Sequence, residues 1–320
     1  MTHPRKIYRE IDSLKGFAIF LVVLGHAIIY FPVNLHEIGW CDVLFKMLSG
    51  VHMPLFFTVS GLCFSYRGNY KDFLSKKVKR ILVPYFVFNL LDLVPRALLP
   101  QFVNQSQSVT ESLRDILLYG GAYWFLYTLF IIFAFYPVIY QWQAKSPRRA
   151  MVVTAVCLAL SLIRIPVEAF TIRLISGYLF FFQLGVQIKL SGVRIFELDL
   201  PKRHAPLPFA VAALWLLLLF SPLAGPLETI VSLLSVMVCF FLTRLKLFND
   251  FFEGFGKFSL QIYLLNGFTL VVSRVIICRF TADPFAIIGF NMLVDLVIAY
   301  WGIKYICTRV KLFRLLMGIG

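Results

Sequence analysis

Long apolar stretches follow one another along the whole chain, and this feature limits its fold more than any other. A transmembrane helix needs about 20 predominantly apolar residues, and the sequence offers ten candidate spans of this kind. They lie at about 16–34, 43–66, 81–99, 119–140, 150–163, 169–189, 206–221, 226–243, 258–277 and 284–306. We therefore expect an all-α, polytopic bundle of about ten transmembrane helices, with residues 1–320 forming a single integral membrane domain.

The composition agrees with a chain that lies in a lipid bilayer. Of the 320 residues, 60% are hydrophobic and 15% are charged, whereas soluble domains average about 45–50% and about 25%. This balance excludes a soluble globular protein, a disordered chain and a small disulfide scaffold. The first apolar stretch follows basic residues, as in a signal peptide, but it is long enough to span and no small-residue cleavage pattern follows it. We therefore expect a retained helix.

The surplus of positive charge predicts the topology. Lysine and arginine number 31 against 16 acidic residues, a net charge of +15. Nucleic-acid binding and the positive-inside bias of membrane proteins both produce such a surplus. Placing the N-terminus in the cytoplasm collects most of these residues in predicted inner segments, including Arg5, Lys6, Lys76, Lys202 and Arg203. We therefore expect both termini in the cytoplasm and no nucleic-acid partner, with the polar segment 100–118 as an outer, solvated connector.

The six cysteines are scattered and form no CxxC pair. A thiolate metal site is therefore not expected. Cys41 and Cys278 both fall on the predicted outer side. A disulfide between them is one alternative in an oxidising compartment, but buried free thiols are the favoured interpretation.

Polar and ionisable residues recur at a similar depth in five of the predicted helices. They are His26, His52, Asp92, Asn266 and Asp295. Ionisable groups at membrane depth are costly and indicate function by default, although polar side chains also join helices by hydrogen bonds. We favour function for His26. Both interpretations stay open for His52, Asp92 and Asp295, and packing is favoured for Asn266.

A histidine at this depth has two suitable chemistries. A neutral imidazole can take a proton from a hydroxyl, or it can accept an acyl group on nitrogen. Lys15 precedes His26 by 11 residues, about 16 Å along nearly the same helix face, and Lys79 and Arg80 begin the third span at the same predicted inner mouth. A donor with phosphates and a thioester fits this arrangement, although positive-inside anchoring alone also explains these cations.

Motifs in the right order resemble those of a known family. Arg9-x-x-Asp12-x-x-Lys15-Gly16, followed by FAIFLVVLGH ending at His26, resembles the first helix of the acyltransferase 3 family. These are integral membrane acyltransferases that most often O-acetylate sugars. Further similar segments are His52–Phe57 with Ser60-Gly61, Lys79–Tyr85, Trp124-Phe125-Leu126, Gly177–Phe181 with Gly185, and Gly256–Leu260 with Tyr263-Leu264-Leu265.

The resemblance implies an enzyme of the cytoplasmic (inner) membrane with about ten helices. It would move an acyl group, usually acetyl, from cytoplasmic acetyl-CoA to a hydroxyl of a cell-envelope sugar or glycolipid, with no permanently bound cofactor. His26 would be the essential histidine. Lys15 stands where many members have arginine, and a subgroup similar to fucose 4-O-acetylases also carries lysine there. Asn266 stands where many members have histidine.

We therefore predict His26 as general base or transient acyl carrier, with Asp12 orienting Lys15 by an i,i+3 contact. Donor binding is assigned to Arg9, Lys15, Lys79 and Arg80, and the cavity wall and acceptor binding to His52, Asp92, Trp124 and Asn266. The alternative is a secondary transporter or flippase of a small polar or anionic solute. It explains the helices and the polar groups but not the Arg9–His26 block. A structural or sensory membrane protein would tolerate His26→Ala.

Overall fold

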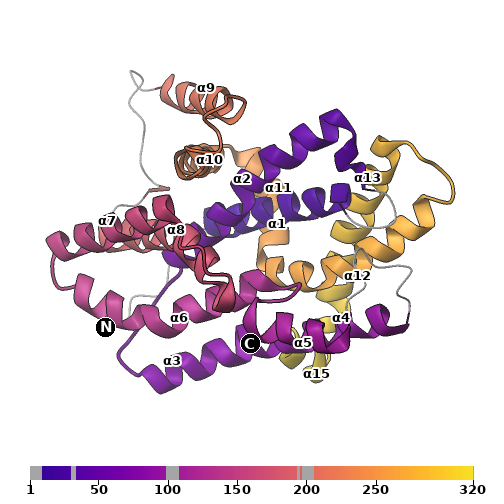
Figure 1. Ribbon diagram of the computed structural model, residues 1–320, viewed down its shortest axis with the longest axis horizontal. Coiled ribbons are helices and arrows are strands. Elements are labelled where there is room, and N and C mark those ends of the chain that lie inside the picture. Colours follow the sequence, from indigo (N-terminus) through magenta and orange to yellow (C-terminus); the bar gives the residue numbers. More distant parts are fainter. Residues whose placement is uncertain (1–8, 30–33, 99–107, 193–194, 197–204, 320) are drawn as a thin grey trace.

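The computed structural model describes residues 9–29, 34–98, 108–192, 195–196 and 205–319. Within these ranges every regular element is a helix (Figure 1). The α-helices are α1 Arg9–Ile29, α2 Gly39–Leu62, α3 Tyr70–Lys77, α4 Val83–Leu98, α5 Val109–Leu118, α6 Trp124–Gln143, α7 Pro147–Ile163, α8 Ile172–Leu190, α9 Leu207–Leu219, α10 Glu228–Leu242, α11 Lys246–Lys257, α12 Ser259–Ile277, α13 Pro284–Leu293, α14 Ala299–Gly302 and α15 Lys311–Leu316. The all-α fold class is confirmed.

Each of the ten expected spans coincides with a helical segment, but their lengths differ. Within the described ranges, six helical stretches are long and apolar enough to cross a membrane, or seven if the bent pair α10 and α11 is one span. The other expected spans correspond to α4, α7, α9 and α10, which have 16, 17, 13 and 15 residues. A helix of 15 residues is only about 22 Å long. The chain is thus a multi-pass bundle with several short helices.

Helix α1 lies in the middle of the bundle, against α2, α11, α12 and α13 (Figure 1). Its closest neighbour is α11, because glycines let the two backbones approach. A Cβ on Gly16 would overlap the carbonyl oxygen of Phe252, and one on Gly256 would overlap that of Asp12. Arg9 ties the same pair together through ion pairs with Asp250 and with Glu253. Small residues at helix crossings are the usual way in which membrane helices pack closely.

Two segments expected as loops are helical. Residues 246–257 form α11, which turns back at 107° to α10 and packs on α1. The second half of the expected outer connector forms α5, which begins with a capping box between Ser108 and Glu111. Residues 99–107 of that connector lie outside the described residues, as do Arg5, Lys6, Lys202 and Arg203.

The described residues contain three π-helical segments, Val78–Leu82, Val294–Ile298 and Ile303–Cys307, of which the first two bear on the site. The first is Val78–Leu82, where the N–H of Val83 bonds the carbonyl of Val78, five residues back. Pro84 follows, and it has no N–H to donate to the carbonyl of Arg80. The second is Val294–Ile298, between α13 and α14. Such turns occur often at functional sites because they re-aim side chains.

The C-terminal end of α1 is held by Arg274 of α12, whose side chain is fully buried. Its guanidinium donates to the carbonyls of Ala27 and Ile28 in the last turn of α1. A cation at this position satisfies carbonyls that lack an intrahelical partner. Cys41 and Cys278 lie near the same guanidinium as free thiols.

Candidate active site

His26 belongs to a chain of hydrogen bonds that joins three segments of the sequence. Its Nδ1 bonds the side-chain oxygen of Asn266 on α12. The Asn266 amide nitrogen donates to Asp295 Oδ2 over 2.6 Å, and the hydroxyl of Thr269 bonds Asp295 Oδ1. Asn266 and Asp295 are 1% and 0% exposed, and His26 is half-buried. Asp295 comes from the second π-turn, so the wide turn aims this carboxylate at α12.

His52 lies on α2, beside α1, close enough to His26 for the two imidazoles to interact electrostatically. Its Nδ1 lies 2.6 Å from the carbonyl oxygen of Leu48, one turn earlier. A carbonyl only accepts, so Nδ1 carries the proton and Nε2 is left with a lone pair. Two residues later, Pro54 cannot bond the carbonyl of Gly50. The hydroxyl of Ser235 on α10 lies 3.2 Å from this carbonyl and supports the helix there.

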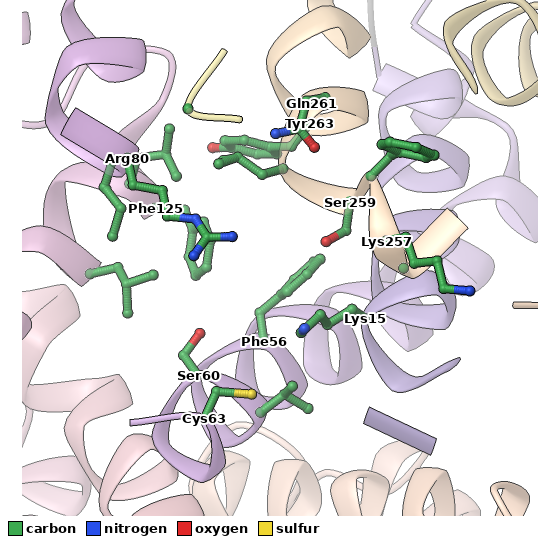
Figure 2. Close-up of a pocket in the computed structure, with 18 of the residues that line it drawn as sticks. Lys15, Phe56, Ser60, Cys63, Arg80, Phe125, Lys257, Ser259, Gln261 and Tyr263 are labelled. Atoms are coloured by element: carbon green, nitrogen blue, oxygen red, sulfur yellow. The ribbon is translucent and has the colours of Figure 1, made fainter. Parts of the chain in front are cut away.

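A cavity of about 360 Å³ opens between α1, α2, α6, α11 and α12, and neither His26 nor His52 is among its lining residues (Figure 2). Figure 2 shows Lys15 and Arg80 pointing into it from opposite sides. Its lining also includes Lys77 and Lys257. We call these four cations the basic mouth.

The opposite end of the cavity is aromatic. Phe56, Phe125 and Tyr263 line it, with ring centroids 5.4 Å apart for Phe56 and Phe125 and 5.8 Å apart for Phe125 and Tyr263. We call these three residues the aromatic end.

Three helices place the histidines beyond this aromatic end. On α2, Phe56 is one turn from His52. On α12, Tyr263 is three residues before Asn266. On α1, Lys15 precedes His26 by 11 residues, about 16 Å of rise. Each helix thus carries part of one order: α1 runs from a cation to His26, α2 from an aromatic ring to His52, and α12 from an aromatic ring to Asn266, the partner of His26.

A second hollow of about 560 Å³ adjoins the basic mouth and shares Lys77 and Arg80 with it. Arg67 and Lys76 add two more cations, and Asp72 adds one acidic group. Arg80 sits in the first π-turn. Lys77 lies one turn earlier, with its Nζ 3.8 Å from the centroid of the Phe133 ring. Together the two hollows form one positively charged entrance.

The other predicted donor residues are placed unequally. The expected contact between Lys15 and Asp12 is present, with Lys15 Nζ 3.1 Å from Asp12 Oδ1. Arg9 is engaged by Asp250 and Glu253 of α11 and does not line the cavity.

Lys79 is exposed and lines neither hollow. Lys77, three residues before Arg80, lies where Lys79 was expected. The sequence carried a signal for this position, because residues three apart share a helix face.

Two predicted acceptor residues lie away from the hydrogen-bonded chain of His26. Asp92 lines a small hollow with Asn89, Ser112 and Asp115, between α4 and α5. Trp124 stacks on Tyr178 with ring centroids 6.0 Å apart, while its neighbour Phe125 reaches the cavity.

Sequence reasoning missed Thr269, Lys257 and the aromatic end. Their residue types are ordinary in a membrane helix, and only the packing gives them a place at the site. Among the described residues, no group of three or more His, Cys, Asp or Glu side chains is arranged to hold a metal ion.

A bundle of membrane-spanning helices around a buried histidine, with a charged entrance at one end, defines a multi-pass membrane protein with an internal polar site. The chain belongs to the acyltransferase 3 family, since that family's model, described as an acyltransferase domain, matches residues 8–307.

Two proteins resemble part of the chain at low sequence identity. The chain is 27% identical over 139 residues to nodulation protein NolL of Mesorhizobium japonicum, covering 42% of this chain and 36% of that protein. It is 26% identical over 141 residues to nodulation protein NolL of Sinorhizobium fredii, covering 41% and 38%. The chain thus matches less than two fifths of the length of these relatives. No solved structure matches.

Proposed function

We propose that this protein moves an acyl group, acetyl in the first instance, from acyl-CoA in the cytoplasm to a hydroxyl of a cell-envelope sugar or glycolipid. The observation that carries the proposal is the cavity that runs from the basic mouth to the aromatic end, with His26 standing 11 residues beyond Lys15 on the same helix. Membership of an acyltransferase family supports the reaction class. The cavity supports the donor, because its charged and apolar parts are arranged as a phosphate-bearing thioester requires.

The donor would bind with its phosphates at the basic mouth. Arg80 presents a planar fork of donors that suits phosphate oxygens, whereas Lys15 and Lys77 act as point charges. Lys257 is partly neutralised by Glu253, 2.5 Å away, so its contribution is smaller. The pantetheine arm and thioester would then lie along the apolar wall toward Phe56 and Tyr263.

His26 would act in one of two ways. As a base, its bare ring nitrogen takes the proton of the acceptor hydroxyl while the hydroxyl oxygen attacks the thioester carbon, and the C–S bond breaks to release CoA. As a carrier, the same nitrogen attacks the thioester carbon first and the C–S bond breaks, which gives an acyl-imidazolium, still protonated on its other nitrogen, and the CoA thiolate. The acceptor hydroxyl oxygen then attacks the acyl carbon, the C–N bond breaks to restore the neutral imidazole, and the hydroxyl proton is released. In both routes the thiolate of CoA leaves and a proton from the acceptor balances its charge.

His52 would hold the acceptor. Its Nδ1 is engaged by Leu48, and its Nε2 lone pair can accept a hydrogen bond from a sugar hydroxyl near His26. This hydroxyl would be a neighbour of the attacking one, because a hydroxyl has a single proton and the attacking hydroxyl gives its proton to His26. Asp92 and Trp124 remain proposed acceptor contacts at the opposite end of the bundle from the basic mouth.

The test is donor turnover by the purified protein. The protein in nanodiscs is incubated with radiolabelled acetyl-CoA and a membrane lipid extract, and CoA release and transferred label are measured. His26→Gln should lower CoA release by a factor of about 10² or more, the range of a lost general base. His36→Gln is the matched control, because His36 pairs with Asp42 outside the site and its loss should leave turnover unchanged.

Two further outcomes decide between the alternatives. Label on the protein when the lipid extract is omitted would assign the acyl-carrier route, and its absence would assign the base route. Failure to bind acetyl-CoA, together with no turnover in the presence of the extract, would contradict the proposal and favour transport of an anionic solute.

A further inference from the structure

The hydrogen bonds around Asn266 constrain the protonation of His26. An asparagine amide has an oxygen that accepts hydrogen bonds and a nitrogen that donates them. If the nitrogen faces Asp295, the oxygen is the atom that faces His26, and the reverse holds for a flipped amide. Here the amide nitrogen lies 2.6 Å from Asp295 Oδ2, and the amide oxygen faces His26 Nδ1. An amide oxygen only accepts, so His26 must donate through Nδ1.

We infer that Asp295 and Thr269, acting through Asn266, hold His26 as the tautomer protonated on Nδ1, which leaves Nε2 as the reacting atom. The role of Nε2 as the reacting atom rests on the proposed function. The position of the proton on the imidazole does not, because it is a property of the protein without substrate. Asp295, Thr269 and Asn266 are positioning residues: they do not meet the substrate, and they act through the imidazole.

The amide orientation holds in either charge state of Asp295. When Asp295 is ionised, both its oxygens accept, one from Asn266 and one from Thr269. When Asp295 is protonated on Oδ1, this O–H can donate a hydrogen bond to the Thr269 hydroxyl oxygen. The Thr269 hydroxyl then donates its own hydrogen to the carbonyl of Leu265, 3.1 Å away. Oδ2 continues to accept from Asn266 in both cases. Thr269 therefore lets the carboxyl gain or lose a proton without reversing the amide.

Burial makes this arrangement costly to reverse. Asn266 and Asp295 are 1% and 0% exposed, so a flipped amide would point its NH2 at the ring and its oxygen at the carboxyl oxygen. Leaving a buried polar group without a partner costs about 1–3 kcal/mol, and water has little access to compensate. The tautomer is thus fixed by packing and hydrogen bonds together.

The tautomer determines which ring nitrogen of His26 can react. The Nδ1 edge of the imidazole faces α12, where it is occupied by Asn266. In this tautomer Nε2 is the unprotonated nitrogen of the ring, so it carries the lone pair that takes a proton or attacks a carbonyl carbon. A wrong tautomer would place a proton on the nitrogen that must take one, and tautomer errors of this kind cost large factors in turnover.

The inference is tested by measuring which ring nitrogen of His26 carries the proton. The protein is labelled with ¹⁵N-histidine, placed in nanodiscs without donor, and its ring nitrogen signals are measured by NMR; His26→Gln assigns the His26 signals. The expected spectrum shows a protonated Nδ1 and an unprotonated Nε2. A proton on Nε2 in the unmodified protein would overturn the inference without any variant being needed.

A matched pair of variants tests the part of Asp295. Asp295→Asn can still turn its oxygen to Asn266 and its NH2 to Thr269, so it should keep the tautomer and stay within about threefold of normal kcat. Asp295→Leu removes the acceptor, so it should give mixed tautomers and lower kcat by about 10²-fold, with KM for acetyl-CoA within about twofold. An unchanged tautomer in Asp295→Leu would contradict the role of Asp295. If that variant fails to fold, Asp295→Ala removes the same acceptor with a smaller side chain.

The two proposals can fail separately. The expected tautomer with no donor turnover would retain the inference about the ring and contradict the acyltransferase function. Turnover that depends on His26 together with a proton on Nε2 would retain the function and overturn the inference.

Discussion

The α-carbon of Gly16 lies against the carbonyl oxygen of Phe252, so that α1 and α11 touch backbone to backbone. Lys15 directly precedes Gly16 in the sequence. The contact between the two helices therefore determines how deeply the ammonium group of Lys15 reaches into the cavity. The reciprocal contact of Gly256 with Asp12 places Lys257 and the start of α12 at the same level. One close helix crossing thus positions two of the four cations of the basic mouth.

Replacing Gly16 should separate these helices. Gly16→Ala should lower the free energy of unfolding by about 1–3 kcal/mol, the usual cost of overpacking, and raise KM for acetyl-CoA. Gly289→Ala is the control, because a Cβ there meets nothing within 4 Å. Thermal unfolding in detergent measures the first effect and steady-state kinetics the second. Equal stability of the two variants would contradict the role of the crossing.

Neighbouring cations of the third span should differ in their effect on donor binding. Arg80→Gln and Lys77→Gln should each raise KM for acetyl-CoA about tenfold, because a charge-assisted hydrogen bond contributes about 1.5–3 kcal/mol. Lys79→Gln should change it by less than about twofold, since Lys79 lines neither hollow. Titration of each variant with acetyl-CoA at two salt concentrations checks this. A larger effect at Lys79 than at Arg80 would place the donor elsewhere.

Cys63 reports on the entrance and on the topology. It is exposed and lines the cavity near Ser60, whereas Cys239 is buried. A membrane-impermeant maleimide should label Cys63 only when added from the cytoplasmic side, and CoA should slow this labelling. Mass spectrometry of inside-out and right-side-out vesicles measures both effects, with Cys63→Ser as the control. Labelling from the outer side would reverse the predicted topology.

The aromatic end should set the length of the acyl group. Phe56→Ala removes a ring that closes the cavity, so the ratio of butyryl to acetyl transfer should rise about tenfold, within the range that a few methylenes can supply in an apolar pocket. Phe280→Ala, at an exposed position, should leave the ratio unchanged. Competition between the two donors measures the ratio. An unaltered ratio in Phe56→Ala would mean that the acyl group does not reach these rings.

Much of the fold was predictable because its causes are local. A run of apolar residues must form a helix in a bilayer, since its backbone has no other hydrogen-bond partners there. All ten expected spans are helical for this reason. Helix α11 was missed because its sequence, with several charges among phenylalanines, reads equally well as an inner loop. Its helical state depends on the packing surface that α1 offers.

The candidate site was predictable only in part. His26, Lys15 and Asp12 lie on one helix, so their spacing and the resemblance to a family were enough to single them out, and the Lys15–Asp12 contact follows from helical geometry alone. Lys79 was chosen over Lys77 because spacing alone, which puts Lys77 on the same helix face as Arg80, does not tell which face of the segment Lys76–Arg80 lines the cavity. The π-turn before Pro84 decides that, since it shifts the faces of the residues around it.

The sequence by itself determined that this chain lies in a membrane, that it is helical, and that a histidine stands deep in its first helix, because hydrophobicity and backbone hydrogen bonding act along the chain. Only the tertiary structure decided what that histidine meets. Asn266 and Asp295 are 240 and 269 positions away from it, and no local rule joins them. They reach His26 because α12 packs beside α1 and the π-turn that carries Asp295 packs on α12.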